Sequence, residues 1–184
     1  MSDESLTNLH RLVWTAIMAA LTAVGAYIQF PLGPVPFSMQ TFFILLAGLI
    51  LGPGYGALSM LLYLGAGLIG LPVFAKGASG FAQFMGPTGG FLIGFILLAA
   101  GAGLATGGKP RPGGLSWIRG VAFCLLGTLL LYVLGIWRLK AVIGSDWTKA
   151  LSVGLFPFIP GLVLKIAGAV ACYRYLARRR LLPS

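Results

Sequence analysis

The chain has 184 residues, of which 58% are hydrophobic and 9% charged, and its formal net charge is +10. A soluble domain needs a charged surface to stay in water, so this composition excludes that class and predicts a membrane-embedded protein. The basic residues flank apolar segments rather than forming one patch. We therefore interpret them as topology-setting charges near anionic lipid and expect no nucleic-acid partner.

Six apolar runs follow one another along the chain, and each predicts a transmembrane helix. They cover residues 12–30, 38–51, 57–70, 88–105, 118–137 and 155–177. The second and third runs are shorter than the about 20 residues that a perpendicular span needs, and such short spans are tolerated where they line a cavity. We predict an all-α membrane protein of six transmembrane helices. It forms a single domain over residues 1–184, with a polar N-terminal tail at 1–10 and a basic C-terminal tail at 178–184.

The basic residues orient this bundle. With the N-terminus inside, eight Lys and Arg residues fall in inner segments and four in outer segments. Cytoplasmic segments carry the excess of positive charge, so we expect both termini in the cytoplasm and a multi-pass protein of the cell (plasma or inner) membrane. The inner residues are Arg11, Lys109, Arg111, Arg119, Arg174, Arg178, Arg179 and Arg180, and the outer ones are Lys76, Arg138, Lys140 and Lys149.

Residues that could carry catalysis are scarce. The only carboxylates are Asp3, Glu4 and Asp146, all outside the predicted spans, which disfavours a proton-coupled carrier. The chain has no GxxxxGK[ST] loop for nucleotide binding, and its single histidine, His10, leaves no metal constellation and no catalytic triad. We predict a protein that is not an enzyme and that holds no metal or cofactor.

Lys165 is the one charged residue well inside a predicted span. It lies roughly 13 Å from either end of that span, near mid-membrane. A lysine is costly at that depth, so we favour a ligand-facing role over snorkelling to an interface. Pro160 and Gly161 predict a helix restart just before it, which would add free amide donors beside the ammonium group. This combination suits acceptor groups such as a carboxylate or a ureido carbonyl.

Two further features concern the connections between the predicted helices and the surface of the first helix. The connections at 34–40, 71–88 and 156–161 are expected at the outer face together, and the long second one is either a lid with apolar contacts or an ordinary surface loop. In the first run, small residues repeat at a spacing that lets another helix approach closely, either an internal helix or another subunit. These residues are Ala16, Ala19, Ala20 and Ala23.

Three motifs, in order along the chain, carry a family resemblance. They read GPVPFSMQTFFILLAGLILGPGYGALSMLLYLGAGLIGLPVF, then GPTGGFLIGF, then PFIPGLVLK. Together they resemble the biotin-transporter S-component family of energy-coupling-factor (ECF) importers, and the similarity runs from about residue 16 to residue 177. The resemblance implies the S-component fold, with a biotin pocket open to the outside. It also implies that the small-residue stripe docks on a transmembrane coupling subunit driven by two ATP-binding subunits.

The resemblance also suggests which residues bind the ligand. Lys165 matches the family's pocket lysine, Gln40 and residues 36–41 match the motif before the second helix, and residues 74–90 match the loop over the pocket. The family's last motif carries an aspartate where this chain has Leu162, so an acceptor for the ureido N–H groups is lost, and Gln83, Gln40 or a backbone carbonyl is expected to replace it. The predicted substrate-binding residues are Lys165, Gln40, Gln83, Thr41, Ser38, Phe74, Gly89, Phe158 and Tyr132.

Three functions stay open at this point. The first is a high-affinity biotin-binding membrane subunit of an ATP-driven vitamin uptake transporter, with biotin as transported ligand. The second is a stand-alone facilitator or secondary carrier for biotin or a related small carboxylic acid. The third is a structural membrane subunit without a ligand.

Overall fold

The computed structural model describes residues 3–30, 35–108 and 114–182, without the side chains of residues 3–6. Lys109, Arg111 and residue 34, which entered the predictions above, lie outside this description. Helices make up most of the fold, and a two-residue antiparallel ladder pairs Gln29 with Ser38 and Phe30 with Phe37. The elements are α1 (Asp3–Tyr27), β1 (Gln29–Phe30), β2 (Phe37–Ser38), α2 (Gln40–Leu68), η1 (Ala75–Gly77), α3 (Ala82–Met85), α4 (Gly89–Gly103), α5 (Trp117–Ile143), α6 (Trp147–Gly154), η2 (Phe156–Phe158) and α7 (Ile159–Arg178).

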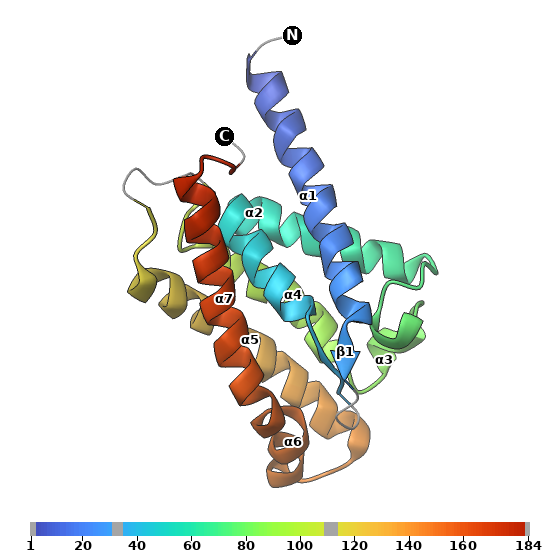
Figure 1. The fold of residues 1–184 in the computed structure, drawn as a ribbon. Helices are drawn as coiled ribbons and strands as arrows, with labels where there is room; N and C mark the ends of the chain where they lie inside the picture. The colour runs from blue at the N-terminus through green and yellow to red at the C-terminus, as the bar shows by residue number, and fades with distance from the viewer. Residues whose placement is uncertain (1–2, 31–34, 109–113, 183–184) are drawn as a thin grey trace.

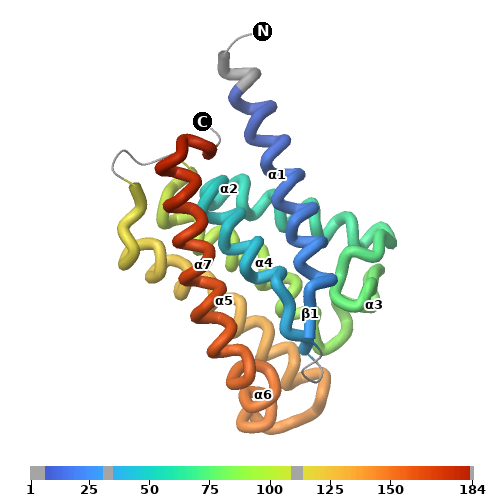
Figure 2. Tube along the Cα trace, viewed as in Figure 1, coloured from blue at the N-terminus to red at the C-terminus, as the bar shows by residue number. Residues whose placement is uncertain are grey.

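Helix α2 is two helices joined by a sharp turn. Gly52 has φ 79° and ψ −177°, which is not helical, and Pro53 follows it. A Cβ built on Gly56 would lie 3.0 Å from the Cα of Gly48, whereas residues eight apart in a straight helix are about 12 Å apart. The chain therefore doubles back at this turn, and the two halves run in different directions in Figures 1 and 2.

Helix α4 occupies the centre of the bundle, between α2 and α5. Close approach of backbones explains the glycines in α4 and in the helices that pack on it. A Cβ on Gly48 of α2 would meet the carbonyl oxygen of Ala99 at 2.2 Å, and one on Gly101 would meet the Cα of Gly127 in α5 at 2.6 Å. Helices α1 and α7 both pack on α2. Small residues at these contacts therefore let the helices pack closely, as is common in membrane bundles.

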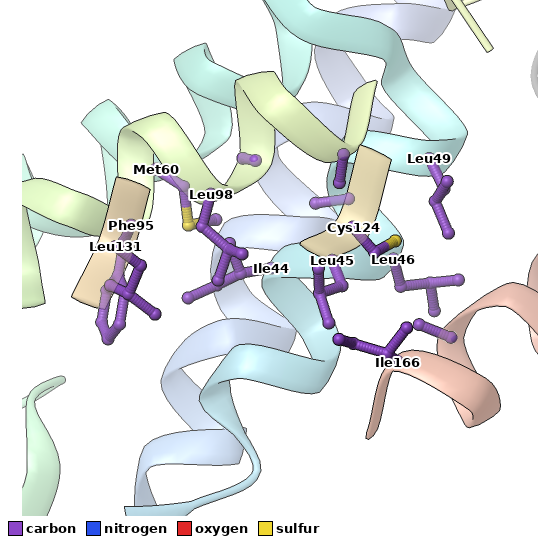
Figure 3. Close-up of a cluster of buried hydrophobic side chains, with 14 of the residues drawn as sticks. Ile44, Leu45, Leu46, Leu49, Met60, Phe95, Leu98, Cys124, Leu131 and Ile166 are labelled. Atoms are coloured by element: carbon purple, nitrogen blue, oxygen red, sulfur yellow. The ribbon is translucent and has the colours of Figure 1, made fainter. Parts of the chain in front are cut away.

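The core lies where α2, α4, α5 and α7 meet. Figure 3 shows side chains from all four helices converging there. Most of them are less than 7% exposed. The labelled residues are Ile44, Leu45, Leu46, Leu49, Met60, Phe95, Leu98, Cys124, Leu131 and Ile166.

Within the described ranges, four helical segments are long and apolar enough to cross a membrane. They are Thr7–Tyr27, Gln40–Leu68, Trp117–Ile143 and Trp147–Arg178, with the shorter apolar helix Gly89–Gly103 beside them. The predicted count of six spans is not confirmed, because the second and third runs are joined in α2 and the fourth gives a helix of only 15 residues. Residues 138–154, which lie between the fifth and sixth predicted runs, are largely helical, because they extend α5 to Ile143 and form α6.

Helix α1 begins and α7 ends at the same end of the molecule. Arg174, near the end of α7, donates a hydrogen bond to the carbonyl oxygen of Leu115, and Arg11 in α1 lies over the ring of Tyr55, beside the Gly52 turn. Figure 1 places β1, α3 and α6 away from this end. The two ends therefore differ: Arg11 and Arg174 lie at one, and the short elements and irregular connections around β1, α3 and α6 lie at the other.

Candidate functional site

A cavity of about 170 Å³ opens at the end formed by the irregular connections. Its walls come from the β2 region and the start of α2, from η1 and α3, from α4 and α5, and from the α6–α7 connection and α7 itself. The three connections expected together at the outer face thus meet at one cavity. The lining residues are Val35, Pro36, Ser38, Gln40, Thr41, Ala75, Lys76, Gln83, Pro87, Thr88, Phe91, Leu92, Phe95, Leu131, Tyr132, Gly154, Phe158, Leu162 and Lys165.

Lys165 is the buried cation of this cavity, with 8% of its surface exposed. Its Nζ donates a hydrogen bond of 2.5 Å to the backbone carbonyl oxygen of Ser38, and it lies 3.9 Å from the centroid of the Phe37 ring. That ring stacks on Phe158, with centroids 6.1 Å apart. Helix α7 begins at Ile159 with Pro160 in its first turn, as the sequence predicts. The carbonyl and the ring share the stabilisation of the ammonium group, which leaves further donors for a ligand.

Gln40 forms the polar wall next to Lys165. It is the first residue of α2 and is only 5% exposed. Its Oε1 accepts a hydrogen bond of 2.8 Å from Ser38 Oγ, and its Nε2 donates one of 2.5 Å to the hydroxyl of Tyr63. The amide is therefore held in place before any ligand arrives.

The mouth of the cavity is formed by the connection between α2 and α4. Lys76 lines the cavity and is exposed to solvent, so it lies at the opening, and its φ of 62° is rare for a residue with a side chain. Gln83 Nε2 donates a hydrogen bond of 3.1 Å to Thr88 Oγ1, which ties α3 to the start of α4. The connection that the resemblance places over the pocket therefore lies at the mouth of the cavity.

Apolar and aromatic side chains form the opposite wall, from α4 and α5. Phe91 packs edge-on against Tyr132 with centroids 5.9 Å apart, and Phe95 and Leu131 lie beside them. Among the residues that the structure describes, none that lines the cavity is acidic. The site can thus hold a ligand with an apolar body and an anionic or acceptor-rich end.

Most of the predicted binding residues line this cavity, and two do not. Phe74 is 1% exposed and packs edge-on against Tyr63 and Phe84, with centroids 5.6 and 5.8 Å away, so it supports the mouth from behind. Gly89 begins α4, and a Cβ there would meet the carbonyl oxygen of Phe84 at 1.9 Å. The residues that do line it are Lys165, Gln40, Gln83, Thr41, Ser38, Phe158 and Tyr132.

Sequence reasoning missed several lining residues. Lys76 was counted only as an outer charge, although its place in a glycine-rich loop between two spans was a usable signal. Phe91, Phe95 and Leu131 carry no such signal, because they are apolar residues in apolar helices. Leu162, identified as the departure from the family pattern, does line the cavity.

The predicted stripe on α1 is divided by the packing. Ala16 and Ala20 are exposed, together with Ile17 and Val24. Ala19 and Ala23 are partly buried against the core. The first pair therefore faces outward, while the second pair takes part in the internal helix contact that the sequence left as an alternative.

Comparison with known proteins gives consistent matches. The model of the BioY family matches residues 1–181. A probable biotin transporter BioY of Pyrococcus horikoshii is 42% identical over 155 residues, covering 84% of this chain and 88% of the relative. The biotin transporter BioY of Thermotoga maritima is 41% identical over 151 residues, covering 82% and 86%.

A solved structure agrees with these relatives. The crystal structure of the S-component for biotin from an ECF-type ABC transporter matches with a TM-score of 0.85 and 29% identity, over 97% of this chain and 95% of that one. The family resemblance read from the three motifs is therefore confirmed. A non-enzymatic, multi-pass membrane protein, as predicted, accords with these matches.

Proposed function

This chain belongs to the BioY family, and from that premise we propose that it is the biotin-binding membrane subunit of an ECF-type transporter, capturing biotin from the outer face. One observation carries the assignment of the site: the buried Lys165 and the preset amide of Gln40 converge on a cavity whose other wall is aromatic and aliphatic. Biotin has a polar ureido ring, an apolar thiophane and chain, and a carboxylate, which match those three surfaces.

The proposed membrane arrangement has six crossing segments. Counting the two halves of α2 separately and including α4 gives six helices that alternate in direction, which puts both termini on one side. The arginines at the end where α1 begins and α7 ends support a cytoplasmic location for the termini, since positive charge is retained there. The cavity then faces outward, where the vitamin must be captured.

Energy for uptake is proposed to come from partner subunits. The sequence has no nucleotide-binding loop, and its relative of solved structure is a component of an ECF-type ABC transporter. We assign the exposed face of α1 around Ala16 and Ala20 to docking on the transmembrane coupling subunit, whose ATP-binding partners drive transport. A stand-alone carrier, the alternative, finds no comparable support.

Two measurements test this proposal. The chain is purified in lipid nanodiscs, and equilibrium binding of radiolabelled biotin is measured; saturable binding at one site is expected, and no binding would overturn the function. Uptake is then followed in cells that lack other biotin transporters, with and without co-expressed coupling and ATP-binding subunits. ATP-dependent uptake only with those subunits is expected, whereas equal uptake without them would favour the stand-alone carrier.

A further inference from the structure

Tyr63 lies outside the cavity lining, but its hydroxyl contacts a residue that lines it. Its side chain is 2% exposed, and its ring packs against Phe74 and Phe95 with centroids 5.6 and 6.4 Å away. The hydroxyl accepts from Gln40 Nε2 at 2.5 Å and donates to the backbone carbonyl oxygen of Val73 at 3.1 Å. A buried tyrosine between the cavity wall and the start of the mouth segment is thus hydrogen-bonded on both sides.

The direction of these hydrogen bonds is fixed by their chemistry. A backbone carbonyl can only accept, so the single hydroxyl proton of Tyr63 goes to Val73. The tyrosine oxygen is then free only to accept, which requires the NH₂ group of the Gln40 amide to face it. A flipped amide would either place its carbonyl oxygen against the Tyr63 oxygen or draw the hydroxyl proton away from Val73. The arrangement that keeps both hydrogen bonds therefore has Oε1 on the side of Ser38 and the cavity.

The side-chain amide oxygens of Gln40 and of Gln83 at the mouth are the strongest acceptors among the described side chains that line the cavity. The two lysines of the cavity, Lys165 and Lys76, offer donors only, and no lining residue in the described part of the chain is acidic. The ureido ring of biotin carries two N–H donors that lose water on binding and must find partners. Gln40 Oε1 accepts one hydrogen bond, from Ser38 Oγ, and a carbonyl oxygen has a second lone pair.

We propose that Tyr63 is a positioning residue for ligand binding, which fixes the Gln40 amide so that Oε1 accepts a ureido N–H of biotin. This inference rests on the proposed function and names one residue behind its specificity. Without the Tyr63 hydroxyl, the amide can turn its NH₂ group toward the ligand, donor against donor.

The test is a double-mutant cycle on biotin affinity, measured with radiolabelled biotin on protein in nanodiscs. Tyr63→Phe removes the hydroxyl and keeps the ring packing, and it is expected to weaken biotin binding roughly tenfold. Gln40→Met keeps the side-chain length without polar atoms and is expected to cause a similar loss. In the Gln40→Met background, adding Tyr63→Phe is expected to change affinity less than about twofold.

A merely structural role would give a different result. If Tyr63 only supported the fold, its substitution would weaken binding by the same factor in both backgrounds, and that outcome would overturn the inference. Tyr55→Phe, which removes a tyrosine hydroxyl near the Gly52 turn, serves as the matched control and is expected to bind like the wild type. If Tyr63→Phe fails to fold, the Gln40→Met variant, which leaves Tyr63 intact, still provides a test. Wild-type biotin affinity in Gln40→Met would overturn the inference.

The outcomes distinguish a failure of the proposed function from a failure of the role assigned to Tyr63. A wild-type protein that does not bind biotin overturns the proposed function, and this inference with it. A wild-type protein that binds biotin while Tyr63→Phe binds equally well overturns only the role of Tyr63.

Discussion

The ammonium nitrogen of Lys165 lies 2.5 Å from the backbone carbonyl oxygen of Ser38, which is 127 residues earlier in the chain. This contact joins α7 to the start of α2 across the floor of the cavity. It explains how a lysine is held inside an apolar segment, since a carbonyl oxygen and the Phe37 ring replace water around the charge. An acceptor group of the ligand would take up an N–H donor of the ammonium group that these two neighbours leave free.

Replacing this lysine tests whether it holds the ligand. Lys165→Met keeps most of the stem and removes the charge, so biotin affinity should fall roughly 10- to 100-fold, as expected for the loss of a buried charged hydrogen bond. Equilibrium binding in nanodiscs measures this directly. Lys149→Met removes the same charge from an exposed position on α6 and should leave affinity unchanged. Wild-type affinity in Lys165→Met would exclude this lysine from the site.

Lys76 should act mainly on the rate of capture. It is exposed at the cavity mouth, where a positive charge steers an anion toward the opening. Lys76→Asn removes the charge and tolerates the positive φ of this position. We expect biotin association to slow several-fold at low ionic strength and this difference to fade near 1 M salt, where charges are screened beyond about 3 Å. Stopped-flow binding measures the association rate at low and at high salt, with Lys149→Asn as control. A slower association that persists in high salt would indicate a direct contact between Lys76 and the ligand instead.

The turn inside α2 should be intolerant of a side chain. At Gly52 an alanine would adopt φ 79°, and its Cβ would lie 2.4 Å from the backbone nitrogen of Gly108. We expect Gly52→Ala to destabilise the protein by about 2 kcal/mol or more, because the left-handed conformation and the backbone contact both disfavour it. Thermal unfolding in detergent should show a lower midpoint. Gly54→Ala is the matched control, since a Cβ there meets nothing within 4 Å, and equal midpoints for the two variants would contradict the prediction.

The exposed face of α1 should matter for transport and not for binding. Ala16→Trp and Ala20→Trp each place a bulky group where the coupling subunit is proposed to approach. Biotin binding to the isolated chain should stay within about twofold of wild type, while ATP-dependent uptake with the partner subunits should be largely lost. Leu129→Trp, on an exposed position of α5, should affect neither. Normal uptake by both alanine variants would place the docking surface elsewhere.

The helices were largely predictable, because membrane burial leaves a strong apolar signal. Each predicted run overlaps a helix, and the restart at Pro160 appears as expected. The joining of the second and third runs was not predictable from hydropathy, since a break with Gly and Pro reads as a loop even when only one residue leaves the helical conformation. Helix α6 was missed for a similar reason, because the polar residues at its start are typical of a loop.

Most of the polar side of the site could be predicted, whereas of the aromatic and apolar side only Phe158 and Tyr132 were. Lys165 and Gln40 stand out because polar groups are costly in a membrane segment. Phe91 and Phe95 lie in a helix that is buried on nearly every side, so its sequence does not say which face borders a cavity. Phe74 was expected at the pocket because its loop borders it, but the ring packs on Tyr63 behind the lining.

The turn at Gly52 has a consequence for how the chain is threaded through the bilayer. Were α2 to continue straight, its two halves would form a single crossing, and every segment after Gly52 would be delivered to the opposite leaflet. Lys76 and Lys165 would then face the cytoplasm, while Ser38 and Gln40 remained outside, and no common cavity would exist. In the proposed six-segment arrangement, the turn at one residue without a side chain would therefore bring both parts of the site to the same side of the membrane.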